Sequence, residues 1–138
     1  MSKQRLTIDT NQMISALLGG RARTILYSGH FRFFTTERKT WEVKQYIPFI
    51  SSKTGVSEER VLRAFELFPI VVYQDAFFDS HKNHALKLIG ARDPTDADLL
   101  ALTLKLKCPL WSHDHDFQKI PEITILRTED LLAILAEG

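Results

Sequence analysis

The sequence has little cysteine and no long apolar run, and both absences limit where the protein works. Its 138 residues include one cysteine, Cys108, which excludes an internal disulfide and a zinc site built on two thiolates. No stretch approaches the roughly 20 uncharged apolar residues of a membrane-spanning helix, and the start MSKQRLTIDT lacks the apolar centre of a signal peptide. We therefore expect a cytoplasmic protein that does not enter the membrane.

The chain also lacks compositional bias and a large net charge. Hydrophobic residues make up 44% and charged residues 25%, which excludes a fibrous repeat and a disordered tail and fits a single domain over residues 1–138. The net charge of +1 hides an asymmetry, since residues 1–63 hold 11 Lys and Arg against 5 Asp and Glu, whereas residues 64–138 hold 7 against 12. Such sorting is typical either of an acidic site beside a basic surface that guides a polyanion or of ordinary solvated faces.

Short β-prone runs alternate with helical patterns along the chain. The predicted strands are 5–9, 31–34, 70–73, 109–112 and 123–126. The predicted helices are 13–18, a helix capped by Thr35 or Thr36 that carries 41–47, then 57–67, 76–89, 93–106 with Asp93 as its cap, and 128–135 with Thr128 as its cap. Parallel strands require such crossovers, so we predict an α/β fold, a three-layer α/β/α sandwich with a mostly parallel sheet of about five strands.

Acidic residues stand at the predicted strand ends. Asp9 ends the first strand and Asp114 follows the fourth, where open parallel sheets bind their ligands. Asp96 begins the buried helix that leads into the fourth strand, which places it at the same edge of the sheet. Three carboxylates in one place repel one another unless a hard divalent cation neutralises them, so we expect Mg²⁺ or Mn²⁺.

Each acid also has an ordinary structural interpretation. Asp9 can be a turn or cap residue, and Asp96 can complete a capping interaction. We interpret Asp98 as a solvated acid that compensates the dipole of its helix. Asp114 and Asp116 can form a polar turn, although two alternating acids repel without a cation.

Three segments together resemble the PIN-domain nucleases, in particular the VapC-like toxin ribonucleases. They are IDTNQMISALL (Ile8–Leu18), RDPTDADLLALTLKL (Arg92–Leu106) and PLWSHDHDF (Pro109–Phe117). Their order and spacing match over essentially the whole chain, and the last two are specific in combination. The resemblance implies a PIN-like, Rossmann-like fold and a carboxylate cluster that binds one or two Mg²⁺ or Mn²⁺ ions for phosphodiester hydrolysis.

The resemblance also assigns roles residue by residue. It implies catalytic acids at Asp9, Glu42, Asp96 and Asp114, metal ligands at Asp9, Asp96, Asp114 and Asp116, and supporting groups at Asn11 and Ser112. Glu37 is the rival for the second acid. We prefer Glu42 because its spacing to Tyr46 resembles the family's helix, whereas Glu37 compensates a helix amino end.

Other side chains are candidates for contact with a substrate or a metal. Arg21, Arg23, Arg38 and Lys39 are candidate phosphate contacts, and Tyr27, Phe31 and Trp111 are candidates for stacking on bases. Ordinary solvated charge and core packing are the alternatives. His113 and His115 flank Asp114 and either bind a transition metal or, as we prefer, form surface hydrogen bonds.

The resemblance makes a metal-dependent endoribonuclease of single-stranded or loop RNA the leading hypothesis. It also implies a toxin with a partner antitoxin and a homodimer. The alternative is a non-catalytic RNA-binding or assembly module. The presence of the acids argues against this alternative, because clustered carboxylates destabilise a fold that needs no metal. A phosphatase with an aspartyl nucleophile ranks lower, since Asn11 stands where its second Asp is usual.

Overall fold

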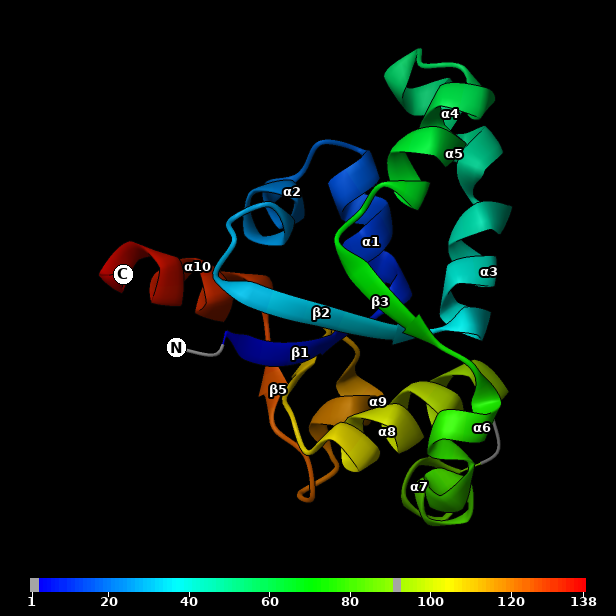
Figure 1. The fold of residues 1–138 in the computed structure, drawn as a ribbon, viewed down its shortest axis with the longest axis vertical. Coiled ribbons are helices and arrows are strands. Elements are labelled where there is room, and N and C mark those ends of the chain that lie inside the picture. Colours follow the sequence, from blue (N-terminus) through cyan, green and yellow to red (C-terminus); the bar gives the residue numbers. More distant parts are fainter. Residues whose placement is uncertain (1–2, 91–92) are drawn as a thin grey trace.

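A parallel sheet of five strands forms the centre of the molecule (Figure 1). This computed structural model describes residues 3–90 and 93–138, so Arg92, which begins the second family-like segment, lies outside the described residues. The strands are β1 (Gln4–Ile8), β2 (Phe31–Thr36), β3 (Ile70–Tyr73), β4 (Leu110–Trp111) and β5 (Ile125–Leu126). Their order is β3-β2-β1-β4-β5, and every pairing is parallel. The direction of strand addition therefore reverses between β1 and β4, where such sheets bind ligands.

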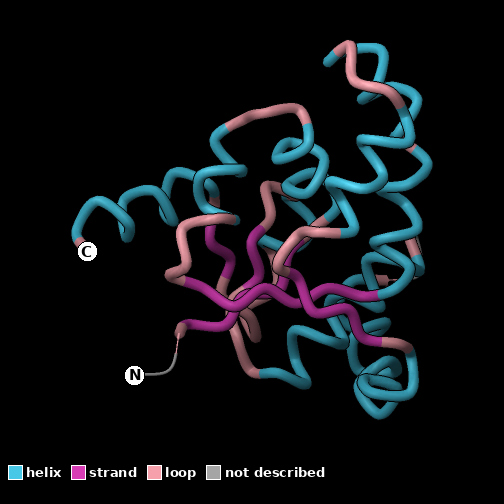
Figure 2. The backbone as a smooth tube through the Cα atoms, turned by 45° about the horizontal axis from the view of Figure 1, so that its top comes forward, coloured by secondary structure: helices cyan, strands magenta, loops and turns pink. Residues whose placement is uncertain are grey.

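Helices cover both faces of the sheet and make it the middle of three layers (Figure 2). One apolar core joins the sheet to α1 (Thr10–Leu17), α2 (Arg21–Leu26), α3 (Glu37–Gln45), α4 (Ile47–Thr54), α5 (Glu58–Glu66) and α10 (Thr128–Glu137). The other core joins it to α6 (Asp75–Phe78), α7 (Lys82–Ile89), α8 (Pro94–Leu106) and α9 (His115–Gln118), with the short 3₁₀ turn η1 (Asp79–His81) between α6 and α7. The α/β/α sandwich is thus confirmed.

Successive side chains along the strands point to opposite faces of the sheet and pack into the two cores alternately. Phe33 and Trp111 pack in the first core, whereas their neighbours Phe34 and Leu110 pack in the second. Helix α8 is apolar on nearly every side, as its sequence predicts, and the side chains of Leu99–Leu102 are fully buried. Burying each leucine stabilises the fold by about 1.5–3 kcal/mol, so α8 is a rigid support for the acids at its amino end.

The structure corrects several predicted boundaries. Residues 21–26, for which no helix was predicted, form α2, because Ala22, Ile25 and Leu26 are spaced to bury one side of a short helix. The predicted helix 76–89 is broken at η1, and α9 was not predicted. The predicted helix 57–67 is present as α5, and Ser57 caps it by accepting a hydrogen bond from the backbone N–H of Arg60.

The amino end of α10 also differs from the prediction. The cap position is Arg127, whose backbone N–H donates to Asp130 at 2.7 Å, and Thr128 is the first helical residue. The Thr128 side chain is turned inward and contacts β4 instead of capping the helix. No helix among the described residues has the length and apolar character needed to cross a membrane.

Candidate active site

Asp9 lies directly after β1, at the point where the strand order reverses. Its Oδ1 accepts a hydrogen bond from the backbone N–H of Thr10 at 2.8 Å, so it caps α1. Its Oδ2 accepts a hydrogen bond from the Ser112 hydroxyl at 2.8 Å, and the residue is 6% exposed. The cap interpretation therefore holds, and the two contacts fix the carboxylate at the carboxyl edge of the sheet.

Ser112 joins Asp9 to the turn after β4. Its buried hydroxyl also accepts a hydrogen bond from the backbone N–H of Asp114 at 3.0 Å. Asp114 in turn caps α9, and its Oδ1 accepts from the backbone N–H of Asp116 at 2.9 Å. The hydroxyl thus sets the separation of two acids that the sequence places more than a hundred residues apart.

Helix α3 brings two further charged groups to the same edge. Thr36 caps the helix through the backbone N–H of Lys39, and Lys39 and Glu42 then lie three residues apart on one face. Glu42 Oε1 accepts a hydrogen bond from the Thr10 hydroxyl at 3.2 Å. Glu37 is exposed in the first turn and lies outside this cluster. The structure thus brings Glu42, and not Glu37, to the acids after β1 and β4.

Lys39 lies inside the acidic cluster. Its ammonium nitrogen Nζ is 2.7 Å from Asp96 Oδ1, 3.1 Å from Asp9 Oδ1 and 3.3 Å from Glu42 Oε1. The residue is only 3% exposed, so it does not occupy the surface position expected of a phosphate contact. Burial alone would lower the pKa of Lys39, but the charges of its three carboxylate partners and the hydrogen bond to Asp96 outweigh burial and raise it. The ion pairs therefore favour the charged form of Lys39.

Asp96 projects from the first turn of α8 toward Lys39. Burial raises the pKa of Asp96 to about 6, against the lowering effect of Lys39, and the charges of Asp9 and Asp93 add to the increase. Asp93 acts as the predicted cap of α8, since its Oδ1 accepts from the Thr95 backbone at 2.9 Å and hydroxyl at 2.7 Å. Asp96 is therefore held in the cluster in an environment that disfavours its charge.

These groups line one small cavity of about 160 Å³ at the carboxyl edge of the sheet. Its lining consists of Asp9, Thr10, Asn11, Lys39, Glu42, Tyr46, Asp93, Asp96 and Asp114. The acidic donors are all hard carboxylate oxygens, which fits Mg²⁺ or Mn²⁺ rather than a softer metal. Within residues 3–90 and 93–138, no three acidic, histidine or cysteine side chains form a ready-made metal site. Three of the carboxylates instead converge on Lys39.

The remaining candidate residues lie outside the cavity lining. Asp116 is half-buried in the first turn of α9. Arg21 is exposed at the start of α2, and Arg23 on the same helix donates to the carbonyl oxygens of Ala16 and Leu17, which end α1. The basic side chains of α2 thus gather away from the acids.

Asp98 differs from its interpretation as a solvated acid. It is 4% exposed and lies 3.3 Å from Arg38 Nε and 3.6 Å from Lys82 Nζ. Burial raises the pKa of Asp98, against the lowering charges of these two partners. Arg38, a predicted phosphate contact, is half-exposed and tied through this pair to α8.

The histidines beside Asp114 have separate surroundings. His113 Nε2 lies 2.9 Å from the Thr128 hydroxyl and accepts the Thr128 backbone N–H at 3.1 Å, whereas His115 is exposed. The same hydroxyl accepts a hydrogen bond from the indole of Trp111 at 3.1 Å. The nitrogen of His113 that faces Thr128 is therefore engaged in holding α10 against β4. Trp111 and Phe31 are buried, so core packing, the alternative to stacking on bases, holds for both, whereas Tyr27 is exposed.

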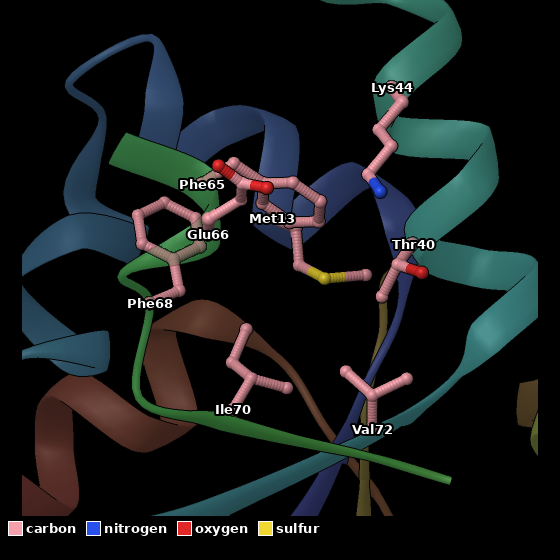
Figure 3. A pocket seen from close by; sticks show the side chains of 8 residues that line it. All are labelled: Met13, Thr40, Lys44, Phe65, Glu66, Phe68, Ile70 and Val72. Carbon is pink, nitrogen blue, oxygen red and sulfur yellow. The ribbon is translucent and has the colours of Figure 1, made fainter. Parts of the chain in front are cut away.

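A different cavity, of about 350 Å³, lies between α1, α3, α5 and the edge strand β3 (Figure 3). Met13, Phe65, Phe68, Ile70 and Val72 give it an apolar lining, and Lys44 points toward it from α3. It contains none of the clustered acids. The smaller, polar cavity is therefore the candidate active site.

Comparison with known proteins agrees with this architecture. The structure resembles a "Toxin-antitoxin complex from Klebsiella pneumoniae" with a TM-score of 0.65 and 18% identity, covering 89% of this chain and 97% of that one. It also resembles PAE2754 from Pyrobaculum aerophilum, with a TM-score of 0.66 and 16% identity, covering 98% and 91%. The third is VapBC2 from Rickettsia felis bound to a promoter DNA fragment, with a TM-score of 0.64 and 12% identity, covering 90% and 98%. At these identities the likeness shows the fold.

A comparison of the sequence with models of protein families identifies the family of the chain. No curated protein has a significant sequence match to the chain. A sequence model described as "PIN domain" matches residues 7–132, which run from the end of β1 into the first half of α10 and include every residue that lines the acidic cavity. The chain therefore belongs to the PIN-domain family.

Proposed function

We propose that the protein is a metal-dependent endoribonuclease whose active site is the acidic cavity. The observation that carries this proposal is the convergence of Asp9, Glu42, Asp96 and Asp114 on one cavity from four separate parts of the chain. Such a set of hard oxygen donors, at the point where the strand order reverses, suits the binding of a divalent cation and a phosphodiester.

The residues have distinct roles in this proposal. Asp9, Asp96 and Asp114 hold one or two Mg²⁺ or Mn²⁺ ions, with Asp116 as a further ligand. When bound there, such an ion supplies an activated water and positive charge for the leaving oxygen. Ser112 orients Asp9 and Asp114, and Glu42, held by the Thr10 hydroxyl, positions water or a ligand. Asn11 is exposed, lines the cavity and supports the acid at Asp9.

We propose single-stranded or loop RNA as the substrate and a toxin as the biological role. The exposed bases of such RNA reach a small cavity more readily than a duplex does. One structural neighbour is named as a toxin-antitoxin complex and another as VapBC2 bound to its promoter DNA, which supports an antitoxin partner for this chain. We further propose that the protein acts in the cytoplasm as a homodimer. A protein partner would cover exposed apolar side chains, which include Trp41, Phe49, Leu67 and Val72. A small open reading frame beside the gene is the expected source of the antitoxin.

The proposal is tested by incubating the purified protein with structured and unstructured RNAs in Mg²⁺, Mn²⁺ or EDTA. Asp9→Asn and Asp114→Asn are compared with the wild type, and Glu122→Gln, an exposed acid outside the cavity, is the control. We expect metal-dependent cutting that both site variants abolish and the control retains. Cutting that persists in both site variants would show that the acidic cavity is not responsible.

A second candidate, a non-catalytic RNA-binding module, gains support from Lys39. The ammonium neutralises carboxylates that would otherwise destabilise the fold, so the acids alone do not require a metal. RNA binding without cleavage, and no uptake of Mn²⁺, would favour this candidate over the nuclease.

A further inference from the structure

Lys39 occupies the position within the cavity where negative charge is most concentrated. Its ammonium lies within 3.3 Å of oxygens from three carboxylates, which come from the end of β1, from α3 and from α8. Three hard oxygens around one positive charge are the surroundings that a divalent cation requires. The ammonium of Lys39 already contacts all three acids, so a divalent cation at the same point would be repelled by it.

The local fold holds Lys39 in this position. Thr36 accepts the backbone N–H of Lys39 and so starts α3 at a fixed register. The Lys39 side chain is buried, so its ammonium is shielded from solvent while it contacts its three carboxylate partners. Asp114, in contrast, lines the cavity without an ion pair to Lys39 among the contacts of the described residues. The cavity thus has one part neutralised by lysine and another part where acids lie beyond its reach.

We propose that Lys39 is a built-in cation that takes the place of a second divalent ion, so that the cavity binds a single ion beside it. This inference rests on the proposed metal-dependent function and narrows it from one or two ions to one. Lys39 is then a positioning residue, which holds Asp9, Glu42 and Asp96 in place and limits the ion count. Removing its charge frees these carboxylates for one additional cation.

The test counts Mn²⁺ ions bound per chain, by equilibrium dialysis with detection of free Mn²⁺. Lys39→Met preserves much of the buried aliphatic stem while removing the charge. Lys39→Arg preserves the charge, and Lys44→Met, an exposed lysine on the same helix, is the matched control. We expect one ion in the wild type, in Lys39→Arg and in Lys44→Met, and two in Lys39→Met.

The outcomes separate this inference from the proposed function. Equal counts in the wild type and Lys39→Met, or two ions in the wild type, would overturn the role of Lys39 and leave a metal-dependent nuclease possible. No ion in the wild type but one in Lys39→Met would support the lysine as the resident cation and contradict metal dependence of the native site.

Thermal unfolding gives a second readout that needs no RNA. Lys39→Met is expected to melt at a lower temperature than the wild type in EDTA and to gain more from Mn²⁺, because its acids then lack any other counter-ion. If Lys39→Met fails to fold, Lys39→Gln replaces it, and an ion count of two for the wild type alone still overturns the inference.

Discussion

The hydroxyl of Ser112 lies 2.8 Å from Asp9 Oδ2 and joins residues that are 103 positions apart in the sequence. The same oxygen accepts the backbone N–H of Asp114. One buried hydroxyl therefore sets the geometry between the acid that follows β1 and the acid that follows β4. A small change at this position tests whether that geometry matters.

Replacing Ser112 with alanine is expected to lower both stability and RNA cleavage. The change leaves the Asp114 N–H and one oxygen of Asp9 without this partner in a buried place, which costs about 1–3 kcal/mol. Chemical denaturation measures the free energy of unfolding, and cleavage assays in Mn²⁺ measure activity. Ser52→Ala, at an exposed position on α4, is the control. Unchanged stability and activity in Ser112→Ala would show that the hydroxyl does not organise the site.

Glu42→Gln and Glu37→Gln are expected to separate the two candidates for the second acid. Glu42 lies in the cavity, so its loss is expected to reduce the cleavage rate by about 100-fold or more. Glu37 is exposed in the first turn of the same helix, so its replacement should leave the rate unchanged. Initial rates at saturating Mn²⁺ measure both. A selective loss in Glu37→Gln would reverse the assignment.

Asp96→Asn is expected to raise the free energy of unfolding at pH 7.5 in EDTA while abolishing RNA cleavage. The folded protein raises the pKa of Asp96 from 3.8 to about 6. The ionised form of Asp96 therefore lowers the free energy of unfolding by up to about 3 kcal/mol. Between about pH 4 and pH 6 the folded chain binds more protons than the unfolded chain, and stability therefore falls as the pH rises through this range.

Denaturation at several pH values checks the sign of this effect. The stability advantage of Asp96→Asn over the wild type should be fully present above about pH 6 and shrink toward pH 4. Glu122→Gln, at an exposed position, should show no such trend. An Asp96→Asn variant that is less stable than the wild type at pH 7.5 would mean that the pair with Lys39 outweighs the burial of the carboxylate.

Thr128→Val is expected to destabilise the protein by about 1–3 kcal/mol, because it leaves the buried indole N–H of Trp111 without its acceptor. Thr124→Val, at an exposed position, is the control, and thermal denaturation measures both. Mn²⁺ binding should not change, since Thr128 is outside the cavity lining. A loss of Mn²⁺ binding without a loss of stability would instead link His113, which contacts Thr128, to the metal.

Much of the fold follows from local patterns in the sequence. The five strands and helix α8 were predictable because β-prone runs and an apolar helix with an Asp93 cap leave few alternatives. Helix α2 was missed because its six residues are too few to show a clear helical period. The Thr128 side chain was misassigned because its contact with Trp111 is tertiary. Boundaries of this kind depend on packing that the local sequence does not encode.

The acids of the site were predictable for a similar reason, and Lys39 was not. Asp9 and Asp114 follow strands, which alone places them at one edge of the sheet. Lys39 looks like one more basic residue of the first half of the chain. Its position three residues before Glu42 was the available signal, since residues with that spacing share a helix face. The burial that makes its charge part of the site arises only when α3 packs beside α1 and α8.

The most direct test of the account is the chemistry of the ends that the protein leaves on RNA cut in Mn²⁺. A water-based, metal-dependent reaction at the acidic cavity predicts no 2′,3′-cyclic phosphate, and undiminished cutting when the ribose at the cut site lacks its 2′-hydroxyl. Cutting of both substrates, with and without the 2′-hydroxyl, should be lost in EDTA and in Asp9→Asn. Cyclic phosphate ends, or cutting that depends on the 2′-hydroxyl and proceeds in EDTA, would contradict the account.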